Sequence, residues 1–371
     1  MELIATCAFG LEKLVYDELK KLGFWVIKTE DGRVTFKGDD LELIKANLWL
    51  RCADRVEIKM GEFKATTFDQ LFDAVNAMEW EKFVSKNDVF PVAATSVKSM
   101  LHSEPAIQSI VKKAVVKRLQ QKYKIETLPE NSEAVYQIVV KANKDQFIVA
   151  IDSSGDSLHK RGYRFRVNGA PIKETLAAAM VKLSDWAPER SLVDPFCGTG
   201  TIAIEAALIA NNIAPGLKRR FAFQKWGWLN QQNIEQAYTE ARQAITPKGR
   251  LPIYCFDLEQ SVLQLAEANA EQAGFRNLNF KRADFNDLDF SKFENCTFIT
   301  NPPYGERLED KTAVDEMYQK LGEKFAQTKN CSLFIIVADE NFPKLFGRPA
   351  DKNRKLFNGK IRCYLFSFYS K

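Results

Sequence analysis

The order of apolar and polar residues predicts a small α+β unit at the amino terminus. An apolar run over residues 3–9 precedes apolar positions with helical spacing over residues 11–22, which indicates a strand, a turn and an amphipathic helix. A strand pair is predicted on either side of Asp31-Gly32, and a further helix over residues 41–50. This unit, residues 1–48, is too small to bury a large core by itself.

The pattern begins again near residue 55 and predicts a second α+β domain, residues 49–155. Pro91 favours an edge position for its third element, because proline cannot donate to a sheet ladder. The long helix begins at Ser103-Glu104-Pro105 and carries Lys and Arg on one face; a solvated surface is the simpler interpretation, and an RNA contact is the alternative. The predicted elements are a strand at 55–60, a helix at 67–77, a strand at 89–97, a helix at 103–123 and a hairpin of strands 135–141 and 147–152.

Residues 156–371 alternate strands with helices, which is typical of a mostly parallel, doubly wound sheet. Asn358-Gly359 predicts a terminal hairpin that adds the last strand antiparallel to its neighbour. The fold class is therefore α/β, a Rossmann-like domain preceded by two α+β domains. A polar insertion over residues 211–250, with Trp226 and Trp228, is predicted to contact a substrate or partner, because a segment of this length without its own core usually does so.

Composition limits the functional classes. The chain has 371 residues, 46% of them hydrophobic and 27% charged, and its net charge of +5 permits a polyanionic partner without requiring one. No apolar run approaches the roughly 20 residues of a membrane span, and the first apolar run lacks the features of a signal peptide, so we expect a cytoplasmic protein without a membrane partner. With two histidines and no Cys-x-x-Cys pair, we expect no metal site. The cysteines, expected to be reduced and buried, are Cys7, Cys52, Cys197, Cys255, Cys296, Cys331 and Cys363.

Candidate ligand-binding residues follow successive strands of the last domain at their carboxyl ends, where open α/β sheets bind ligands. The first strand leads into the glycine-rich turn of residues 194–201, whose backbone can approach a ligand closely. The second ends at Asp257, which suits ribose hydroxyls, and the third at Asp284 and Phe285, which suit the amino group and the face of an adenine. Each acidic residue alone is more simply a helix cap or a surface carboxylate, but their shared position indicates a nucleotide-like ligand.

The fourth strand leads into Asn301-Pro302-Pro303-Tyr304. The two prolines fix φ and lack backbone N–H groups, which leaves carbonyl oxygens without competing donors. The Asn301 side chain and the Pro302 carbonyl can accept both hydrogens of an exocyclic amino group, while Tyr304 stacks on the base that carries it. This arrangement suits methylation of an amino nitrogen, and a simple Pro-Pro turn is the alternative.

Basic and aromatic residues interleave over residues 159–166. Cations hold phosphates while rings stack on bases, so Lys160, Arg161, Tyr163 and Arg164 are candidate RNA contacts. A charged linker between domains is an equally good interpretation of the same residues.

Four strings in the chain resemble signatures of class I S-adenosylmethionine-dependent methyltransferases that modify exocyclic amino groups, and more closely those of guanine-N2 RNA methyltransferases with a THUMP domain. The resemblance covers nearly the whole chain. The chain is also similar to the amino-terminal half of fused bacterial methyltransferases that act on guanine in large-subunit ribosomal RNA, but it ends after one catalytic domain, which leaves the modified nucleotide open. The strings are Asp194-Pro195-Phe196-Cys197-Gly198-Thr199-Gly200-Thr201, His159-Lys160-Arg161-Gly162-Tyr163-Arg164, Ala170-Pro171-Ile172-Lys173-Glu174-Thr175-Leu176-Ala177-Ala178 and Asn301-Pro302-Pro303-Tyr304-Gly305-Glu306-Arg307.

The resemblance implies a ferredoxin-like part over residues 1–48, a THUMP RNA-binding domain over 49–155 and a class I methyltransferase domain over 156–371. It implies that S-adenosylmethionine is the cofactor and that RNA, first of all rRNA, is the partner. The implied cofactor-binding residues are Asp194, Phe196, Gly198 and Gly200 around the methionine moiety, Asp257 at the ribose, and Asp284 and Phe285 at the adenine.

The implied activity is methyl transfer to the N2 amino group of a guanine in RNA, with Asn301, Pro302 and Tyr304 as the catalytic candidates. A tRNA guanine-N2 methyltransferase and a non-catalytic, RNA-binding ribosome assembly factor stay open as alternatives. Adenine-N6 DNA methyltransferases and glutamine-N5 protein methyltransferases share the tetrapeptide, but they lack the preceding RNA-binding module and the Gly305-Glu306-Arg307 continuation.

Overall fold

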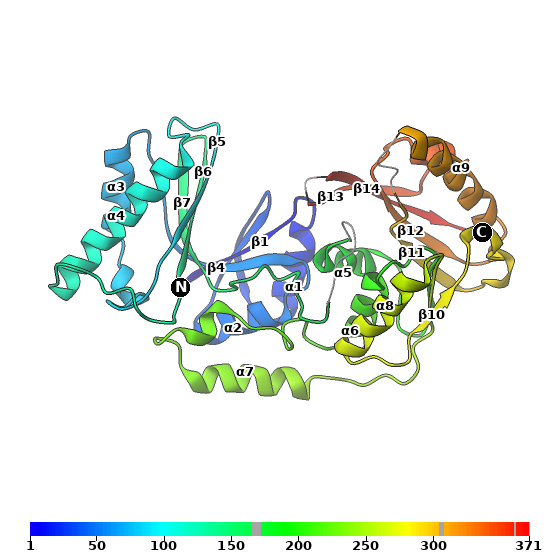
Figure 1. The fold of residues 1–371 in the computed structure, drawn as a ribbon, viewed down its shortest axis with the longest axis horizontal. Coiled ribbons are helices and arrows are strands. Elements are labelled where there is room, and N and C mark those ends of the chain that lie inside the picture. The colour runs from blue at the N-terminus through cyan, green and yellow to red at the C-terminus, as the bar shows by residue number, and fades with distance from the viewer. Residues whose placement is uncertain (165–171, 304–307, 360, 371) are drawn as a thin grey trace.

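The computed structural model describes residues 1–164, 172–303, 308–359 and 361–370, and these residues form two seven-stranded sheets (Figure 1). The first sheet has the order β2-β3-β1-β4-β7-β6-β5 and the second the order β10-β9-β8-β11-β12-β14-β13. The amino-terminal half of the chain therefore builds one sheet and the carboxyl-terminal half the other, as the change of pattern along the sequence predicts.

The long strand β4 (Ala53–Lys64) joins the two amino-terminal units. It pairs antiparallel with β1 on one side and with β7 on the other, so both units share one continuous sheet. The elements of this half are β1 (Glu2–Cys7), α1 (Glu12–Lys21), β2 (Trp25–Glu30), β3 (Arg33–Lys37), α2 (Asp40–Trp49), α3 (Phe68–Asn76), the 3-10 helix η1 (Trp80–Lys82), β5 (Val92–Val97), α4 (Glu104–Tyr123), β6 (Gln137–Asn143) and β7 (Gln146–Asp152).

Several of these elements begin or lie where local sequence signals predict them. β5 begins directly after Pro91 and lies at the edge of the sheet, where a proline removes no ladder hydrogen bond. α4 begins after Ser103, whose side chain accepts from the Ala106 N–H. β6 and β7 pair as the expected antiparallel hairpin. These predictions are confirmed.

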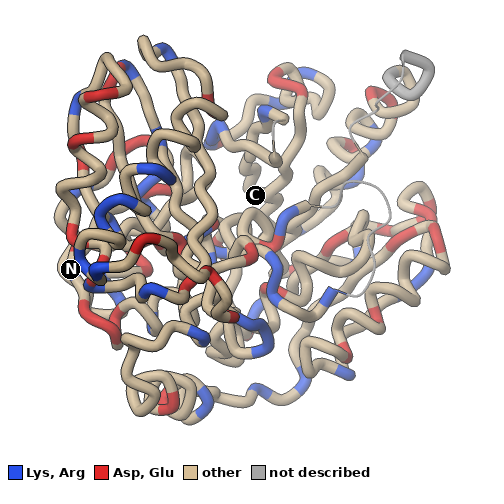
Figure 2. Tube along the Cα trace, turned by 60° about the vertical axis from the view of Figure 1, so that its left-hand side comes forward, with Lys and Arg blue, Asp and Glu red and all other residues tan. Residues whose placement is uncertain are grey.

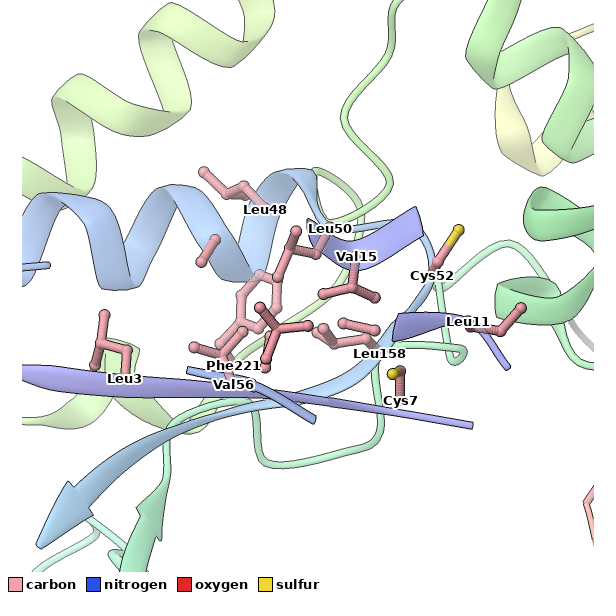
Figure 3. Close-up of a cluster of buried hydrophobic side chains, with 14 of the residues drawn as sticks. Leu3, Cys7, Leu11, Val15, Leu48, Leu50, Cys52, Val56, Leu158 and Phe221 are labelled. Atoms are coloured by element: carbon pink, nitrogen blue, oxygen red, sulfur yellow. The ribbon is translucent and has the colours of Figure 1, made fainter. Parts of the chain in front are cut away.

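The core of the ferredoxin-like unit is completed by segments that are distant in sequence. Leu3, Val15, Leu48 and Val56 pack together from β1, α1, α2 and β4 (Figure 3). Leu158 and Phe221, which come from beyond the first sheet, enter the same cluster and are 1% and 5% exposed. A unit of this size is too small to bury a large hydrophobic core alone. Side chains from later segments of the chain therefore complete its core.

The second sheet has the expected α/β arrangement. Its strands β10, β9, β8, β11 and β12 are parallel, and β14 pairs antiparallel with both β12 and β13, which confirms the terminal hairpin. Helices α5, α6 and α8 cover one face and α9 the other (Figure 1). The elements are α5 (Glu174–Leu183), β8 (Ser191–Asp194), α6 (Thr201–Ala210), η2 (Ala222–Lys225), α7 (Gln231–Gln243), β9 (Ile253–Asp257), α8 (Gln260–Ala273), β10 (Asn279–Arg282), η3 (Phe285–Asp287), η4 (Phe290–Lys292), β11 (Cys296–Thr300), α9 (Leu308–Phe325), β12 (Ser332–Val337), α10 (Phe342–Leu345), β13 (Lys352–Asn358) and β14 (Ile361–Tyr369).

The insertion between α6 and β9 folds back onto the amino-terminal half. The Trp226 ring stacks on Tyr136 at 4.7 Å between centroids, and its Nε1 donates to the Val135 carbonyl at 3.0 Å. In α7, the Glu240 carboxylate lies 2.6 Å from Lys45 of α2. The insertion, referred to below as a strap, therefore connects the two halves of the chain. The prediction that it contacts a substrate or partner is wrong for its tryptophans, because both rings pack against the protein itself. The Trp228 ring lies edge-to-face on Phe83.

Charged residues of both signs are distributed along the chain (Figure 2), and the cysteines lie in its interior. Figure 2 shows Lys and Arg interspersed with Asp and Glu along the trace. All seven cysteines are buried thiols outside any disulfide. Among the described residues, no helix has the length and apolar character needed to cross a bilayer, and no cluster of His, Cys, Asp or Glu is arranged to hold a metal ion.

Candidate active site

Two hydrogen bonds fasten the carboxyl ends of three neighbouring strands to one another. The Thr300 hydroxyl at the end of β11 donates to Asp194 Oδ1 at the end of β8, at 2.7 Å. The Gly198 N–H, in the turn after β8, donates to Asp257 Oδ2 at the end of β9, at 2.9 Å. The structure thus brings together Asp194, Gly198 and Asp257 with the start of the Asn301 tetrapeptide, as their positions at parallel strand ends predict.

Asp194 is a buried carboxylate that organises the turn following β8. Its Oδ1 accepts from the Phe196 N–H at 3.2 Å as well as from Thr300. Complete burial raises the pKa of Asp194 to about 7, against the opposing effect of these two hydrogen bonds. A nearby cation would favour its charged form, so the group suits a site that receives a positively charged ligand.

The two glycines of the turn have different roles. Gly200 has φ +77°, precedes α6, and a Cβ there would lie 3.0 Å from the Phe280 ring, so it is needed for close packing. Gly198 has φ +53°, but a Cβ there would meet no atom within 4 Å. Its left-handed backbone therefore faces open space, as expected where a ligand approaches the main chain.

Asp257 and Asp284 are partly exposed at the ends of β9 and β10. Asp257 also accepts from the Glu259 N–H at 3.0 Å, and Asp284 accepts from the Asn286 N–H at 2.8 Å. A carboxylate has about four acceptor positions. Each group therefore keeps capacity for a ligand hydroxyl or amino group while the backbone holds it in place.

The ring predicted to stack on an adenine is buried. Phe285 is 7% exposed and packs edge-to-face on Phe290. Phe196 lies against Phe285 with centroids 4.8 Å apart and is the more exposed of the two rings. Phe196 therefore offers the larger open surface at this position, and Phe285 supports it from below.

The Asn301 tetrapeptide lies where the sequence places it, directly after β11. Asn301 is partly exposed, Pro302 is buried and Pro303 is exposed. The Tyr318 hydroxyl of α9 donates to the Pro303 carbonyl at 3.5 Å. Tyr304, predicted to stack on a base, lies outside the described residues.

The basic and aromatic stretch near residue 160 does not lie on one surface. Arg161 and Tyr163 are each 3% exposed, and the Arg161 Nε and the Tyr163 hydroxyl both reach Glu205 Oε1, at 3.4 and 3.1 Å. Burial corrects the prediction of an RNA contact for these two side chains, because neither has an open surface. Of the four candidate contacts, Arg164 is bonded to Thr201 Oγ1 at 2.7 Å and Lys160 alone is exposed, next to Asp156, while Phe165 and Arg166 lie outside the described residues.

Three of the five basic side chains on the lysine-rich face of α4 lie beside carboxylates. Lys112 pairs with Glu130, and Arg118 pairs with Glu81 through Nε at 3.0 Å and Nη2 at 2.6 Å. Lys122 lies 3.7 Å from the same Glu81. These ion pairs fit a solvated helix surface, while the exposed Lys113 and Lys117 leave an RNA contact as the alternative.

Two residues that support the site, Thr300 and Asn269, were not predicted from the sequence. Thr300 links β11 to Asp194, and a threonine as the last residue of a buried strand is a weak signal for such a role. Buried Asn269 of α8 donates to the Thr199 carbonyl at 3.3 Å and supports the glycine turn from behind. Nothing in the local pattern of α8 marks it, because its partner is 70 residues away.

A parallel sheet with an antiparallel last hairpin, an open glycine turn and carboxylates at adjacent strand ends fit the class that the four sequence strings resemble, the class I S-adenosylmethionine-dependent methyltransferases. Family models assign the parts of the chain more closely. Residues 161–366 match the RMKL-like methyltransferase domain (UPF0020), residues 2–57 the RlmL ferredoxin-like domain and residues 65–152 the THUMP domain. The chain belongs to the RMKL-like methyltransferase family.

Individual relatives agree with this assignment. The chain is 44% identical, over 100% of its length and 96% of the relative, to "Putative RNA methyltransferase YpsC" of Bacillus subtilis (strain 168). It is 33% identical to the ribosomal RNA large subunit methyltransferase K/L of Pseudoalteromonas atlantica, with 99% of this chain matching 53% of that longer protein. The crystal structure of SMU.472 complexed with SAH has 45% identity and a TM-score of 0.94, covering 100% of this chain and 98% of that one.

The cofactor of this family, S-adenosylmethionine, fits the residues at the strand ends. The open left-handed backbone at Gly198 admits a ligand, and the carboxylates of Asp257 and Asp284 retain acceptor positions. Buried Asp194 suits a cationic group beside it. Phe196 adds a partly exposed ring to this set, whereas Gly200 packs against Phe280 and shapes the turn without open space of its own.

Proposed function

We propose that this protein transfers a methyl group from S-adenosylmethionine to the exocyclic N2 amino group of a guanine in RNA, with large-subunit rRNA as the substrate. The observation that carries the proposal is the position of Asn301-Pro302 directly after β11, joined through Thr300 to Asp194. Amino-group acceptors and cofactor-binding residues then share one edge of the sheet. The THUMP match and the rRNA methyltransferase relative support RNA as the substrate.

The bound cofactor would supply an electrophilic methyl group. The chain's own contribution is to position the nucleophile. Guanine N2 is a weak nucleophile, because its lone pair is delocalised into the ring. The Asn301 side-chain oxygen and the Pro302 carbonyl would accept its two hydrogens and hold the nitrogen with its lone pair directed at the cofactor. No strong general base is needed, since the proton is lost to water after transfer.

The guanine must leave any base stack to reach these acceptors. Tyr304 is the proposed stacking partner for such a single-stranded or flipped base. Asn301 and Pro302 are held by the end of a buried strand, so their geometry is set before the base arrives. This preorganisation is what an amino-group methyltransferase requires.

The test is incubation of the protein with labelled S-adenosylmethionine and separate pools of rRNA, tRNA, DNA and protein from a strain that lacks its gene. Label in N2-methylguanosine from large-subunit rRNA is the expected result. Label in tRNA guanine would move the substrate to tRNA, and label in adenine, DNA or glutamine would reject the guanine assignment. An absence of label in every pool would favour a binding factor without turnover.

The role of Asn301 is tested separately with Asn301→Ala. We expect methyl transfer to be lost, while calorimetry shows unchanged affinity for S-adenosylhomocysteine. Asn353→Ala, at an exposed position of β13 in the same domain, is the matched control and should retain activity. Loss of both activity and cofactor binding in Asn301→Ala would contradict the proposed role.

A further inference from the structure

A groove opens between the ferredoxin-like unit and the methyltransferase domain, outside the cofactor residues. It has a volume of about 270 Å³. One wall is the turn between β1 and α1 together with Asp54, and the other is the start of α5 together with the end of β13. Its lining residues are Ala8, Phe9, Leu11, Asp54, Lys173, Thr175, Leu176, Phe357 and Gly359.

The groove lies on the same edge of the second sheet as the candidate active site. β14 runs antiparallel to β12, with Ser332 opposite Tyr369 and Val337 opposite Tyr364, so the turn between β13 and β14 lies beyond the carboxyl end of β12. The start of α5 reaches this edge as well, because Arg164 Nη2 contacts both the Ile172 carbonyl, at 3.3 Å, and Thr201 at the start of α6. A polymer bound at Asn301 would therefore pass near the groove.

The two walls are held in a fixed relation. Gly10, with φ +91°, lies so close to β13 that a Cβ there would be 2.7 Å from the Lys355 carbonyl oxygen. The Arg354 guanidinium donates to the Gly10 carbonyl at 3.5 Å. The groove is thus preformed, which lowers the entropy cost of binding a ligand between its walls.

The groove places an aromatic ring beside one cation, Lys173, and one carboxylate, Asp54. Phe9 is 46% exposed and meets Phe357 edge-to-face at 6.1 Å between centroids, which leaves ring surface available on Phe9. Lys173 lies near His159, whose pKa falls to about 4 through burial and the adjacent positive charges. Asp54 is the acidic residue of the lining. Burial raises the pKa of its carboxyl group, and the positive charges of Lys173 and Arg55 oppose that rise.

We propose that this groove binds one nucleotide of the RNA substrate, next to the guanine that is methylated. The Phe9 ring stacks on its base and the Lys173 ammonium contacts its phosphate. The volume is slightly below the range of about 300–1,000 Å³ for small-molecule sites, so it suits a single planar ring system better than a larger ligand. The adjacency to a guanine rests on the proposed function, whereas the RNA contact does not.

The test measures RNA binding without requiring methyl transfer. Phe9→Ala, Phe9→Leu and Phe9→Trp are compared with the native protein by fluorescence anisotropy on a short single-stranded RNA that carries 2-aminopurine. We expect the Ala and Leu variants to bind roughly 5- to 150-fold more weakly, which corresponds to the loss of one base–aromatic stack. Phe9→Trp should keep native affinity, because it retains a stacking ring.

Tyr369→Ala is the matched control. Tyr369 lies at the opposite edge of the same sheet, is 36% exposed and likewise meets one ring, Phe334, edge-to-face at 6.1 Å. It should bind RNA as the native protein does. Urea unfolding of each variant checks that the fold is retained, and the comparison uses only variants with native-like unfolding midpoints.

The outcomes separate this inference from the proposed function. Native RNA affinity in Phe9→Ala and Phe9→Leu, with rRNA methylation intact, would overturn the groove and leave the proposed function standing. Phe9-dependent RNA binding by a protein that methylates no rRNA would support the groove and reject the function. Equal weakening by Tyr369→Ala would also overturn the groove, since the effect would not depend on its position.

Discussion

Replacement of Glu205 by Ala should strongly destabilise the protein, because this carboxylate balances buried positive charge between domains. Glu205 of α6 is 0% exposed and Arg161 is 2% exposed in their side chains. A second buried guanidinium, Arg51, is also stabilised in its charged form by Glu205, since burial lowers the pKa of Arg51 and the carboxylate opposes that effect. Removing Glu205 leaves both cations in a dry environment.

The expected loss is about 3–5 kcal/mol, the usual effect of removing one partner from a buried ion pair. Arg161 keeps its bonds to the carbonyls of Leu158 at 2.7 Å and Arg51 at 2.5 Å, which limits the loss. Tyr163 loses the acceptor of its hydroxyl, which adds to it. Typical domains are stable by only about 5–15 kcal/mol, so the variant should be close to unfolding.

The assay is urea unfolding followed by tryptophan fluorescence. It compares Glu205→Ala with the native protein, and it measures the single variants Glu205→Leu and Arg161→Met together with their double variant. The double variant replaces both buried charges by apolar groups of similar size. Its loss of unfolding free energy should therefore be smaller than the sum of the two single losses, by about 1 kcal/mol or more. Lys160→Ala is the matched control, since Lys160 is 60% exposed beside Asp156 and its loss should stay within about 0.5 kcal/mol.

The same variants separate a structural role from an RNA-binding one. Arg161→Met should change RNA affinity only as far as it changes the folded fraction. Lys160→Ala should reduce the slope of the logarithm of RNA affinity against the logarithm of salt concentration by about the amount of one phosphate contact. Strict additivity in the double variant, or a loss below about 1 kcal/mol in Glu205→Ala, would refute the reasoning about buried charge.

Three further changes have expected outcomes. The pKa of Asp194 is about 7 in the folded state and near 3.8 when exposed, so the folded protein holds an extra proton between these pH values. The free energy of unfolding should therefore fall as pH rises from about 4 to 7, by up to about 1.4 kcal/mol per pH unit. Asp194→Asn should flatten this slope when urea unfolding is measured at several pH values. Trp226→Ala should lose about 3–5 kcal/mol in urea unfolding, because the ring is 3% exposed and stacked on Tyr136, while Trp226→Phe should lose less; equal losses would contradict the stacking argument. Gly10→Ala should lose about 1–3 kcal/mol by thermal unfolding through strain and the clash with β13, whereas Gly249→Ala, where a Cβ meets no atom within 4 Å, should be neutral.

Predictions from the sequence succeeded where the deciding interactions are local or periodic. Pro91 marks the edge strand because its missing N–H affects its own ladder position. Asn358-Gly359 marks the terminal hairpin because the turn needs that backbone conformation. The glycine turn and the carboxylates meet at one edge because parallel strands in a doubly wound sheet all end on the same side.

Other features were decided only when distant segments came together. The string at residue 160 alternates cations and rings in the manner of a nucleic-acid contact, yet Arg161 and Tyr163 turn inward because Glu205, 44 and 42 residues away, supplies their buried partner. Likewise, the polar insertion is a strap because Tyr136 and Val135 receive Trp226. Neither partner can be inferred from the local pattern.

The sequence by itself thus determined the order of the elements, the α/β class of the last domain and the edge at which its chemistry lies, because these follow from side-chain periodicity and backbone restrictions. Only the tertiary structure decided which charges are buried, which aromatic rings face solvent and where a groove opens between domains. Those properties depend on desolvation and on contacts between residues far apart in the chain, as Phe9 beside Phe357 illustrates.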